Sequence, residues 1–175
     1  RSMRGNFRNM VLIATADMVQ SSTFMHSIST GLVAFIVARF SRLLNSRCRL
    51  NHKDGSSWTP QEVGAFGERV ACHWLRARGE KILYRNYRAP QGGEVDIVAR
   101  HGKLLLFIEV KTRRAGGVGR PLDAVDRSKQ ELIERGANSW LKLLKTRRIP
   151  WRFDVIEIIL QEGEVPRVNR VENVF

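Results

Sequence analysis

The run KLLLFIEV, residues 103–110, is the segment that most restricts the fold of this chain. Apart from Lys103 and Glu109, all of its residues are apolar. A strand with one face in water would alternate apolar and polar residues, whereas a continuous apolar run is typical of a central strand that is covered on both faces. Such a strand needs a layer of structure on each side of its sheet, and helices commonly provide these layers.

The flanking sequence predicts both helices and the remaining strands. TPQE at residues 59–62 is a capping box, in which Thr59 is the N-cap and Pro60 takes the first helical position. Apolar residues at helical spacing follow until Gly79, and Pro121 opens a second helix. Strands are predicted at residues 81–88, 94–99, 103–110 and 152–159, with a short tail strand through Val168 and Val171. This order predicts an α/β fold with a mixed central sheet flanked by helices.

Charged residues interrupt two of the predicted strands. Glu94 and Asp96 are two apart on one strand, and Glu109 and Lys111 are two apart on the next. Residues two apart on a strand share a face. If the strands pair through the turn at residues 101–102, Asp96 and Glu109 approach each other near one end of the sheet. Two unpaired carboxylates would repel and raise each other's pKa, and a hard divalent cation such as Mg²⁺ removes that conflict.

These residues predict a hydrolytic site. Asp96 and Glu109 are the expected metal ligands, and Mn²⁺ is the expected substitute for Mg²⁺. Lys111 would position the attacking water or stabilise charge on the phosphate. Glu68, at the rim of the first helix's apolar stripe, would supply a third carboxylate to the metal or its waters. Taken alone, Glu109 and Lys111 are more often a structural ion pair, and Glu94 is assigned to a strand edge or a turn, as the partner of an arginine.

Several segments of the chain resemble known families. In chain order, GERVACHWL, ILYRNYR, GGEVDIVA, FIEVKTR, VDRSKQELI, RFDVIEI and VENVF resemble the bacterial YraN family, from about Gly64 to Phe175. Asp96 with the EVK of residues 109–111 resembles the motif of PD-(D/E)xK nucleases, with EVD in place of the usual proline and aspartate. GERVA resembles the corresponding helix of archaeal Holliday junction resolvases. The resemblance implies a restriction-endonuclease-like αβββαβ core and a metal-dependent endonuclease, acting on branched or otherwise structured DNA.

The strong positive charge of the chain favours a polyanionic partner. Lys and Arg number 30 against 17 Asp and Glu, a formal net charge of +13. Nucleic acid is the first expectation, DNA ahead of RNA, and an anionic membrane the second. Phosphate contacts are expected from the flexible basic loop at residues 112–120, from the second helix and from KTRR at residues 145–148, namely Arg113, Arg114, Arg120, Lys129, Arg147 and Arg148. Lys129 would reach either phosphate or the active site. The alternative function is a DNA- or RNA-binding module that keeps the nuclease fold without cutting.

Residues 1–56 are expected to form a basic N-terminal extension ahead of a nuclease-like domain at residues 57–175. The extension holds all 4 methionines and a short amphipathic helix beginning at Gly31, which is too short to span a bilayer. The sequence leaves three alternatives for what this helix lies on: a membrane surface, the domain itself or nucleic acid. Partial disorder of the extension stays open too, as does a true start downstream, with Met25 as a candidate initiator. The 2 cysteines lack zinc-ligand spacing and fit the reducing cytoplasm, and a homodimer is left open.

Overall fold

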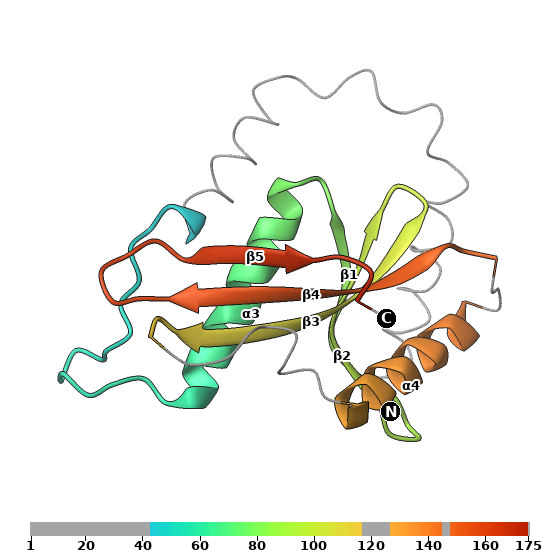
Figure 1. Ribbon diagram of the computed structural model, residues 1–175, viewed down its shortest axis with the longest axis horizontal. Helices are drawn as coiled ribbons and strands as arrows, with labels where there is room; N and C mark the ends of the chain where they lie inside the picture. Colours follow the sequence, from blue (N-terminus) through green and yellow to red (C-terminus); the bar gives the residue numbers. More distant parts are fainter. Residues whose placement is uncertain (1–42, 117–126, 145–147, 175) are drawn as a thin grey trace, which may run out of the picture.

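The computed structural model describes residues 43–116, 127–144 and 148–174, and these residues form one mixed sheet with a helix on each face (Figure 1). The elements are α3 (Pro60–Ala77), β1 (Lys81–Arg88), β2 (Glu94–His101), β3 (Leu104–Arg114), α4 (Arg127–Leu143), β4 (Trp151–Leu160) and β5 (Arg167–Val171). The strand order is β1-β2-β3-β4-β5. β3 and β4 are parallel, and the other neighbouring pairs are antiparallel. The predicted α/β fold is confirmed, and its element order agrees with a restriction-endonuclease-like core.

The boundaries of α3 follow the local signals in the sequence. The Thr59 hydroxyl accepts a hydrogen bond from the backbone N–H of Glu62, and the Glu62 carboxylate accepts one from the backbone N–H of Thr59. Both bonds satisfy amide groups that a helix leaves without partners in its first turn. At the other end Gly79 has a φ of 81°, a conformation that glycine adopts without a steric penalty. Helix α3 therefore begins and ends where the sequence predicted.

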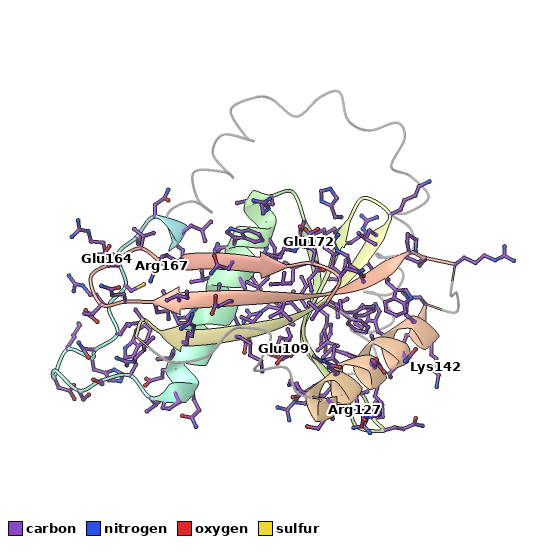
Figure 2. All side chains as sticks on the ribbon, viewed as in Figure 1. Glu109, Arg127, Lys142, Glu164, Arg167 and Glu172 are labelled. Atoms are coloured by element: carbon purple, nitrogen blue, oxygen red, sulfur yellow. The ribbon has the colours of Figure 1, made fainter. Side chains whose placement is uncertain are left out.

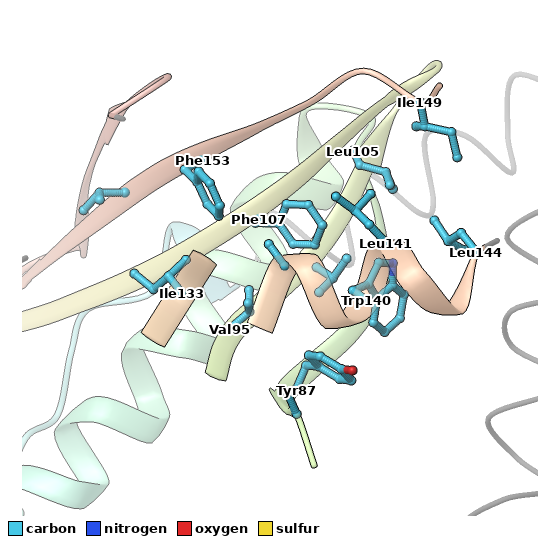
Figure 3. Close-up of a cluster of buried hydrophobic side chains, with 14 residues drawn as sticks. Tyr87, Val95, Leu105, Phe107, Ile133, Trp140, Leu141, Leu144, Ile149 and Phe153 are labelled. Carbon is cyan, nitrogen blue, oxygen red and sulfur yellow. The ribbon is translucent and has the colours of Figure 1, made fainter. Parts of the chain in front are cut away.

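Each face of the sheet carries its own hydrophobic core. Figure 3 shows the core on the α4 face, where Trp140 of α4 packs against Tyr87 of β1, and Phe107 of β3 packs against Phe153 of β4. The opposite core joins α3 to the other faces of the same strands, for example Leu75 to Ile108. Leu106, Phe107 and Ile108 each have 0% of their surface exposed. This burial explains the continuous apolar run in β3, because both of its faces are covered by helices.

β3 continues further than the sequence predicted. Residues 112–114 were assigned to a flexible basic loop, but they belong to the strand, so that assignment is wrong for these residues. The cause is the parallel partner strand, because Thr112 pairs with Ile158 and Arg114 pairs with Leu160. A long buried β4 offers hydrogen-bonding groups to β3 over its whole length, and this partner cannot be inferred from the local sequence.

The segment just before α3 packs as part of the same body. Cys48 and Leu50 are 2% and 1% exposed and lie in the core beneath α3. The Cys48 N–H donates to the Glu164 carbonyl at 2.7 Å, and the Leu50 N–H donates to a Glu162 carboxylate oxygen at 2.6 Å. Packing therefore continues upstream of residue 57, across the boundary expected from the sequence.

The rest of the expected extension, with the helix from Gly31 and the initiator candidate Met25, lies outside the described residues, as does the expected start of the second helix at Pro121. Among the residues described, no helix is both long enough and apolar enough to cross a membrane.

Candidate active site

The candidate site lies where β2 and β3 separate. The two strands pair from His101 opposite Leu104 to Ile97 opposite Ile108. At the next position, Asp96, a side chain replaces the backbone as the hydrogen-bond acceptor for β3. Asp96 Oδ2 accepts a hydrogen bond from the Val110 N–H at 2.8 Å. The carboxylate of Asp96 is therefore directed toward β3.

The regular alternation of side chains also changes at this point. Val95 and Val98 both belong to the α4-side core although they are three residues apart, and Ile97 belongs to the other core. On the neighbouring strand Asn86 has a φ of 52°, in the left-handed region. These irregularities break the period of two along β2, while Glu94 and Asp96 both lie near Lys129 of α4.

Glu109 is the buried centre of the site. Its side chain is 4% exposed, and its Oε1 lies 3.0 Å from Lys111 Nζ and 3.4 Å from Lys129 Nζ. Its Oε2 is buried and has no hydrogen-bond partner among the described residues. Lys129 also binds a carboxylate oxygen of Glu94. Figure 2 shows Glu109 beside the end of α4 that begins with Arg127.

The electrostatics of the site centre on Asp96. Burial, and then the nearby Glu109 carboxylate, raise the pKa of Asp96 to about 7, although the Val110 N–H and Lys129 act in the opposite direction. The hydrogen bond from Lys129 lowers the pKa of Glu94. Burial opposes the charge on Lys129, but Glu94, Glu109 and Asp96 outweigh it and raise the lysine's pKa. The site therefore holds more carboxylate charge than its lysines fully balance.

Close glycine contacts bring both helices to the site. A Cβ on Gly67 of α3 would lie 1.8 Å from Thr112 Oγ1 of β3, so only glycine lets the helix approach this strand. On the other face, a Cβ on Gly93 would lie 2.6 Å from the Gly136 backbone nitrogen of α4. The first contact fixes the position of Glu68, which follows Gly67. The second brings α4, which carries Lys129, against the start of β2.

The structure brings Glu68 near the site but gives it other partners. Its Oε2 accepts a hydrogen bond from Asn86 Nδ2 at 3.1 Å and lies 3.8 Å from Arg85 Nη2. Glu68 is still close enough to contribute to the raised pKa of Asp96. Within the three described ranges, no group of three or more His, Cys, Asp and Glu side chains is arranged to hold a metal ion. Any cation in this arrangement would depend first on Asp96 and Glu109.

Those two carboxylates fit a hard divalent cation. The pKa of Asp96 is raised by burial and by the Glu109 carboxylate, and Glu109 has a buried oxygen that lacks a partner within the described part of the chain. A cation bound to both would remove the repulsion and supply the absent partner, and carboxylate oxygens are the ligands that Mg²⁺ prefers.

The arginines expected to grip phosphate already make intramolecular contacts where they are described. Arg113 Nε lies 2.7 Å from the buried carboxylate of Glu157. Arg114 Nη2 lies 3.1 Å from the Trp58 carbonyl and 3.4 Å from that of Leu50, so it holds the segment before α3. Arg148 is exposed. Arg120 and Arg147 lie outside the described residues.

Sequence reasoning missed that Glu94 belongs to the site, and it left the role of Lys129 open. The partner of Glu94 is Lys129 of α4, whereas the sequence interpretation expected an arginine as the partner of Glu94. A signal for Lys129 exists in the sequence. It precedes the buried residues Ile133 and Gly136 by four and seven positions, and therefore lies on the buried face of α4. A lysine on a buried helical face needs an anionic partner.

Fold and site together define an α/β protein with a mixed five-stranded sheet and a site of carboxylates and lysines where β2 and β3 separate. A family model described as "Uncharacterised protein family UPF0102" matches residues 67–158. The chain belongs to this family, which is the YraN family that its sequence motifs resembled.

Relatives from several bacteria match most of their own length. A UPF0102 protein of Trichlorobacter lovleyi is 42% identical over 116 residues, which cover 66% of this chain and 91% of the relative. The UPF0102 protein CT2262 of Chlorobaculum tepidum is 47% identical over 113 residues, covering 65% of this chain and 87% of the relative. The UPF0102 protein GSU0650 of Geobacter sulfurreducens is 43% identical over 113 residues, covering 65% and 88%.

Proposed function

We propose that this protein is a metal-dependent nuclease that hydrolyses phosphodiester bonds in nucleic acid, with branched or otherwise structured DNA as its substrate. One observation carries the proposal: Asp96 and Glu109 share one end of the sheet, and the Lys111 ammonium lies 3.0 Å from Glu109. A buried carboxylate whose pKa is raised by burial and by a second carboxylate, beside a lysine, is suited to phosphate hydrolysis at a divalent cation.

Each residue of the site has a proposed role. Asp96 and Glu109 would hold Mg²⁺ or Mn²⁺, which when bound polarises a phosphoryl oxygen and makes water a stronger nucleophile. Lys111 donates a hydrogen bond to the attacking water or to a phosphate oxygen from its place beside Glu109. Lys129 holds Glu94 and Glu109 and thereby reduces their repulsion of an incoming phosphate. Glu68 assists from α3, held by Asn86.

The two cysteines support a cytoplasmic location for this activity. Cys48 and Cys72 are free thiols and both are buried. Burial raises the pKa of each thiol and so keeps it in the unreactive protonated form. Free buried thiols are typical of proteins in reducing compartments.

A second candidate function is a nucleic-acid-binding module that keeps this fold without cutting. Its supporting observation is that Lys111 and Lys129 both approach Oε1 of Glu109. The two lysines balance much of the carboxylate charge in the absence of a cation, as a purely structural polar network would.

Cleavage assays on end-labelled linear duplex, single-stranded and four-way-junction DNA distinguish the two functions. We expect cleavage with Mg²⁺ or Mn²⁺ and none with EDTA. Asp96→Asn and Glu109→Gln should each lower the rate by about 100-fold or more, the order found for single groups that stabilise a transition state. Both variants should bind DNA as well as the parent chain or more tightly, because a carboxylate facing phosphate repels it.

Glu134→Gln is the matched control, because it removes one carboxylate from the exposed side of α4. It should leave cleavage unchanged, and the loss of cleavage in Asp96→Asn and Glu109→Gln purified in the same way excludes a contaminating nuclease. A parent chain that binds every DNA form and cuts none with either cation would establish the binding module instead.

A further inference from the structure

A stripe of basic side chains lies along α3, next to the candidate site. Arg69, His73 and Arg76 follow one another at i, i+4 and i+7, the spacing that aligns side chains on one side of a helix. Arg69 and Arg76 are exposed, and His73 is half-buried. Arg85 of β1 is the fourth member, with 44% of its side chain exposed. These four residues are called the α3 stripe.

The members of the α3 stripe lie close enough to act on one another. Burial lowers the pKa of His73, and the charges of Arg76, Arg69 and Arg85 lower it further. The imidazole is therefore within the positive field of all three guanidinium groups. A polyanion that pairs with these groups would relieve their mutual repulsion.

The α3 stripe is continuous with the candidate site. Arg85 Nη2 lies 3.8 Å from Glu68 Oε2, and Arg69 directly follows Glu68 in the chain. Glu68 in turn contributes to the raised pKa of Asp96. From Arg69 to Arg76 the helix rises by about 10 Å. That length matches about three nucleotides of one duplex strand, at roughly 3.4 Å each.

We propose that the α3 stripe binds the phosphate backbone of a nucleic-acid strand that continues into the candidate site. Arginine fits this role because its planar guanidinium binds phosphate oxygens in pairs, without reading sequence. The inference rests on nucleic acid as the partner in the proposed function, and it adds a surface on α3 to the basic residues at the end of β3. Of those, Arg113 already pairs with Glu157, and Arg114 already binds backbone carbonyls.

The test measures how salt weakens DNA binding by the full chain carrying Asp96→Asn, so that cleavage does not disturb the measurement. Arg69→Gln and Arg76→Gln are added together and compared with the control pair Arg49→Gln and Arg167→Gln. The control arginines are also exposed, and Figure 2 shows Arg167 beside Glu164, far from Glu109. Both pairs remove the same charge. The probe is a fluorescently labelled DNA duplex, and circular dichroism verifies that each variant is folded.

The double variant Arg69→Gln and Arg76→Gln is called the stripe pair. It should flatten the log–log slope of DNA affinity against salt concentration by about 1.8, because each lost phosphate contact lowers the slope by about 0.9. Each single variant, Arg69→Gln or Arg76→Gln, should account for about half of this change and serves if the pair fails to fold. The control pair should change the slope by much less. Arg69→Lys with Arg76→Lys keeps both charges and should keep the slope.

Equal slopes for the stripe and control pairs would overturn the proposal. So would tighter binding of the chain to phosphatidylserine vesicles than to DNA, if the stripe pair removed the vesicle binding. Absence of DNA binding at every salt concentration would contradict both the stripe and the proposed function. DNA binding that depends on the stripe, in a parent chain that does not cut, would remove the nuclease and leave the stripe in place.

Discussion

At the scale of single residues, the surroundings of Asp96 favour its charged form in one respect and its neutral form in another. Its carboxylate accepts the Val110 N–H at 2.8 Å, which favours the charged form. Burial and Glu109 favour the neutral form and raise the pKa to about 7 from an ordinary value of 3.8. The folded protein therefore holds a proton on this group more strongly than the unfolded chain does, and the free energy of unfolding must depend on pH.

The Asp96→Asn variant tests this linkage. Because the folded pKa is raised, the contribution of Asp96 to stability is fully present below about pH 4 and is lost as pH rises through about 7. Asparagine keeps an oxygen for the Val110 N–H but never takes a negative charge. In EDTA, the stability advantage of the variant should therefore grow from pH 4 to 7 and stay constant above. Urea unfolding at several pH values measures this difference.

Mg²⁺ provides the second arm of that experiment. At pH 8 it should stabilise the parent chain more than Asp96→Asn, because binding to the charged pair removes the repulsion that the variant lacks. Glu134→Gln, on the exposed side of α4, should show neither effect. A stability difference between parent and Asp96→Asn that is the same at every pH would refute the raised pKa.

At the scale of elements, the site depends on how closely the helices approach the sheet. Helix α3 can contact β3 at Thr112 only because Gly67 has no side chain. Each residue of this contact is the chain neighbour of a site residue, since Glu68 follows Gly67 and Lys111 precedes Thr112. A shift of α3 away from the sheet would therefore move Glu68 relative to Lys111.

Gly67→Ala should lower the free energy of unfolding by about 1–3 kcal/mol, the usual cost of overpacking a close contact. Gly64→Ala is the matched control on the same helix, because a Cβ there meets no atom within 4 Å. It should leave stability unchanged or raise it by up to about 1 kcal/mol, through the better helix propensity of alanine. Thermal unfolding of both variants gives the comparison. Equal effects at the two positions would show that the contact with Thr112 does not constrain α3.

At the scale of the whole molecule, the described part of the chain is held together from both ends. Near its beginning, Leu50 is buried under α3 and its N–H binds Glu162. Near its end, Arg170 of β5 binds Glu80 before β1 and Asp154 of β4, both at 2.5 Å. Asp154 also pairs with Arg152 at 3.0 Å. Segments far apart in the sequence are thus joined by buried contacts.

A chain shortened to begin at residue 57 should therefore be less stable than one that begins at residue 43. The shorter chain lacks Cys48 and Leu50, and losing a buried leucine alone costs about 2–5 kcal/mol. The urea midpoints of the two chains measure the difference, and Leu50→Ala in the full chain should reproduce a large part of it. Identical midpoints would mean that residues 43–56 do not contribute to the fold.

The sequence by itself determined the elements and half of the site, because those features depend on local signals. The capping box at Thr59, the apolar run of β3 and the period-two spacing of Glu109 and Lys111 each involve residues a few positions apart. Asp96 and Glu109 required one further step, the pairing of adjacent strands through a short turn. A short turn restricts that pairing to few registers, so the sequence could predict it.

Only the tertiary structure decided which distant charges meet. Lys129 is 35 residues from Glu94 in the chain, and it reaches Glu94 and Glu109 because Gly93 and Gly136 allow α4 to approach β2 closely. The parallel register of β3 and β4 sets Lys111 opposite Glu157. Arg113 lies two residues further along β3, on the same face as Lys111, and therefore pairs with Glu157 rather than with a ligand. No local pattern specifies that register or that helix position. Both follow from packing side chains on the two faces of the sheet, which is a property of the whole folded chain.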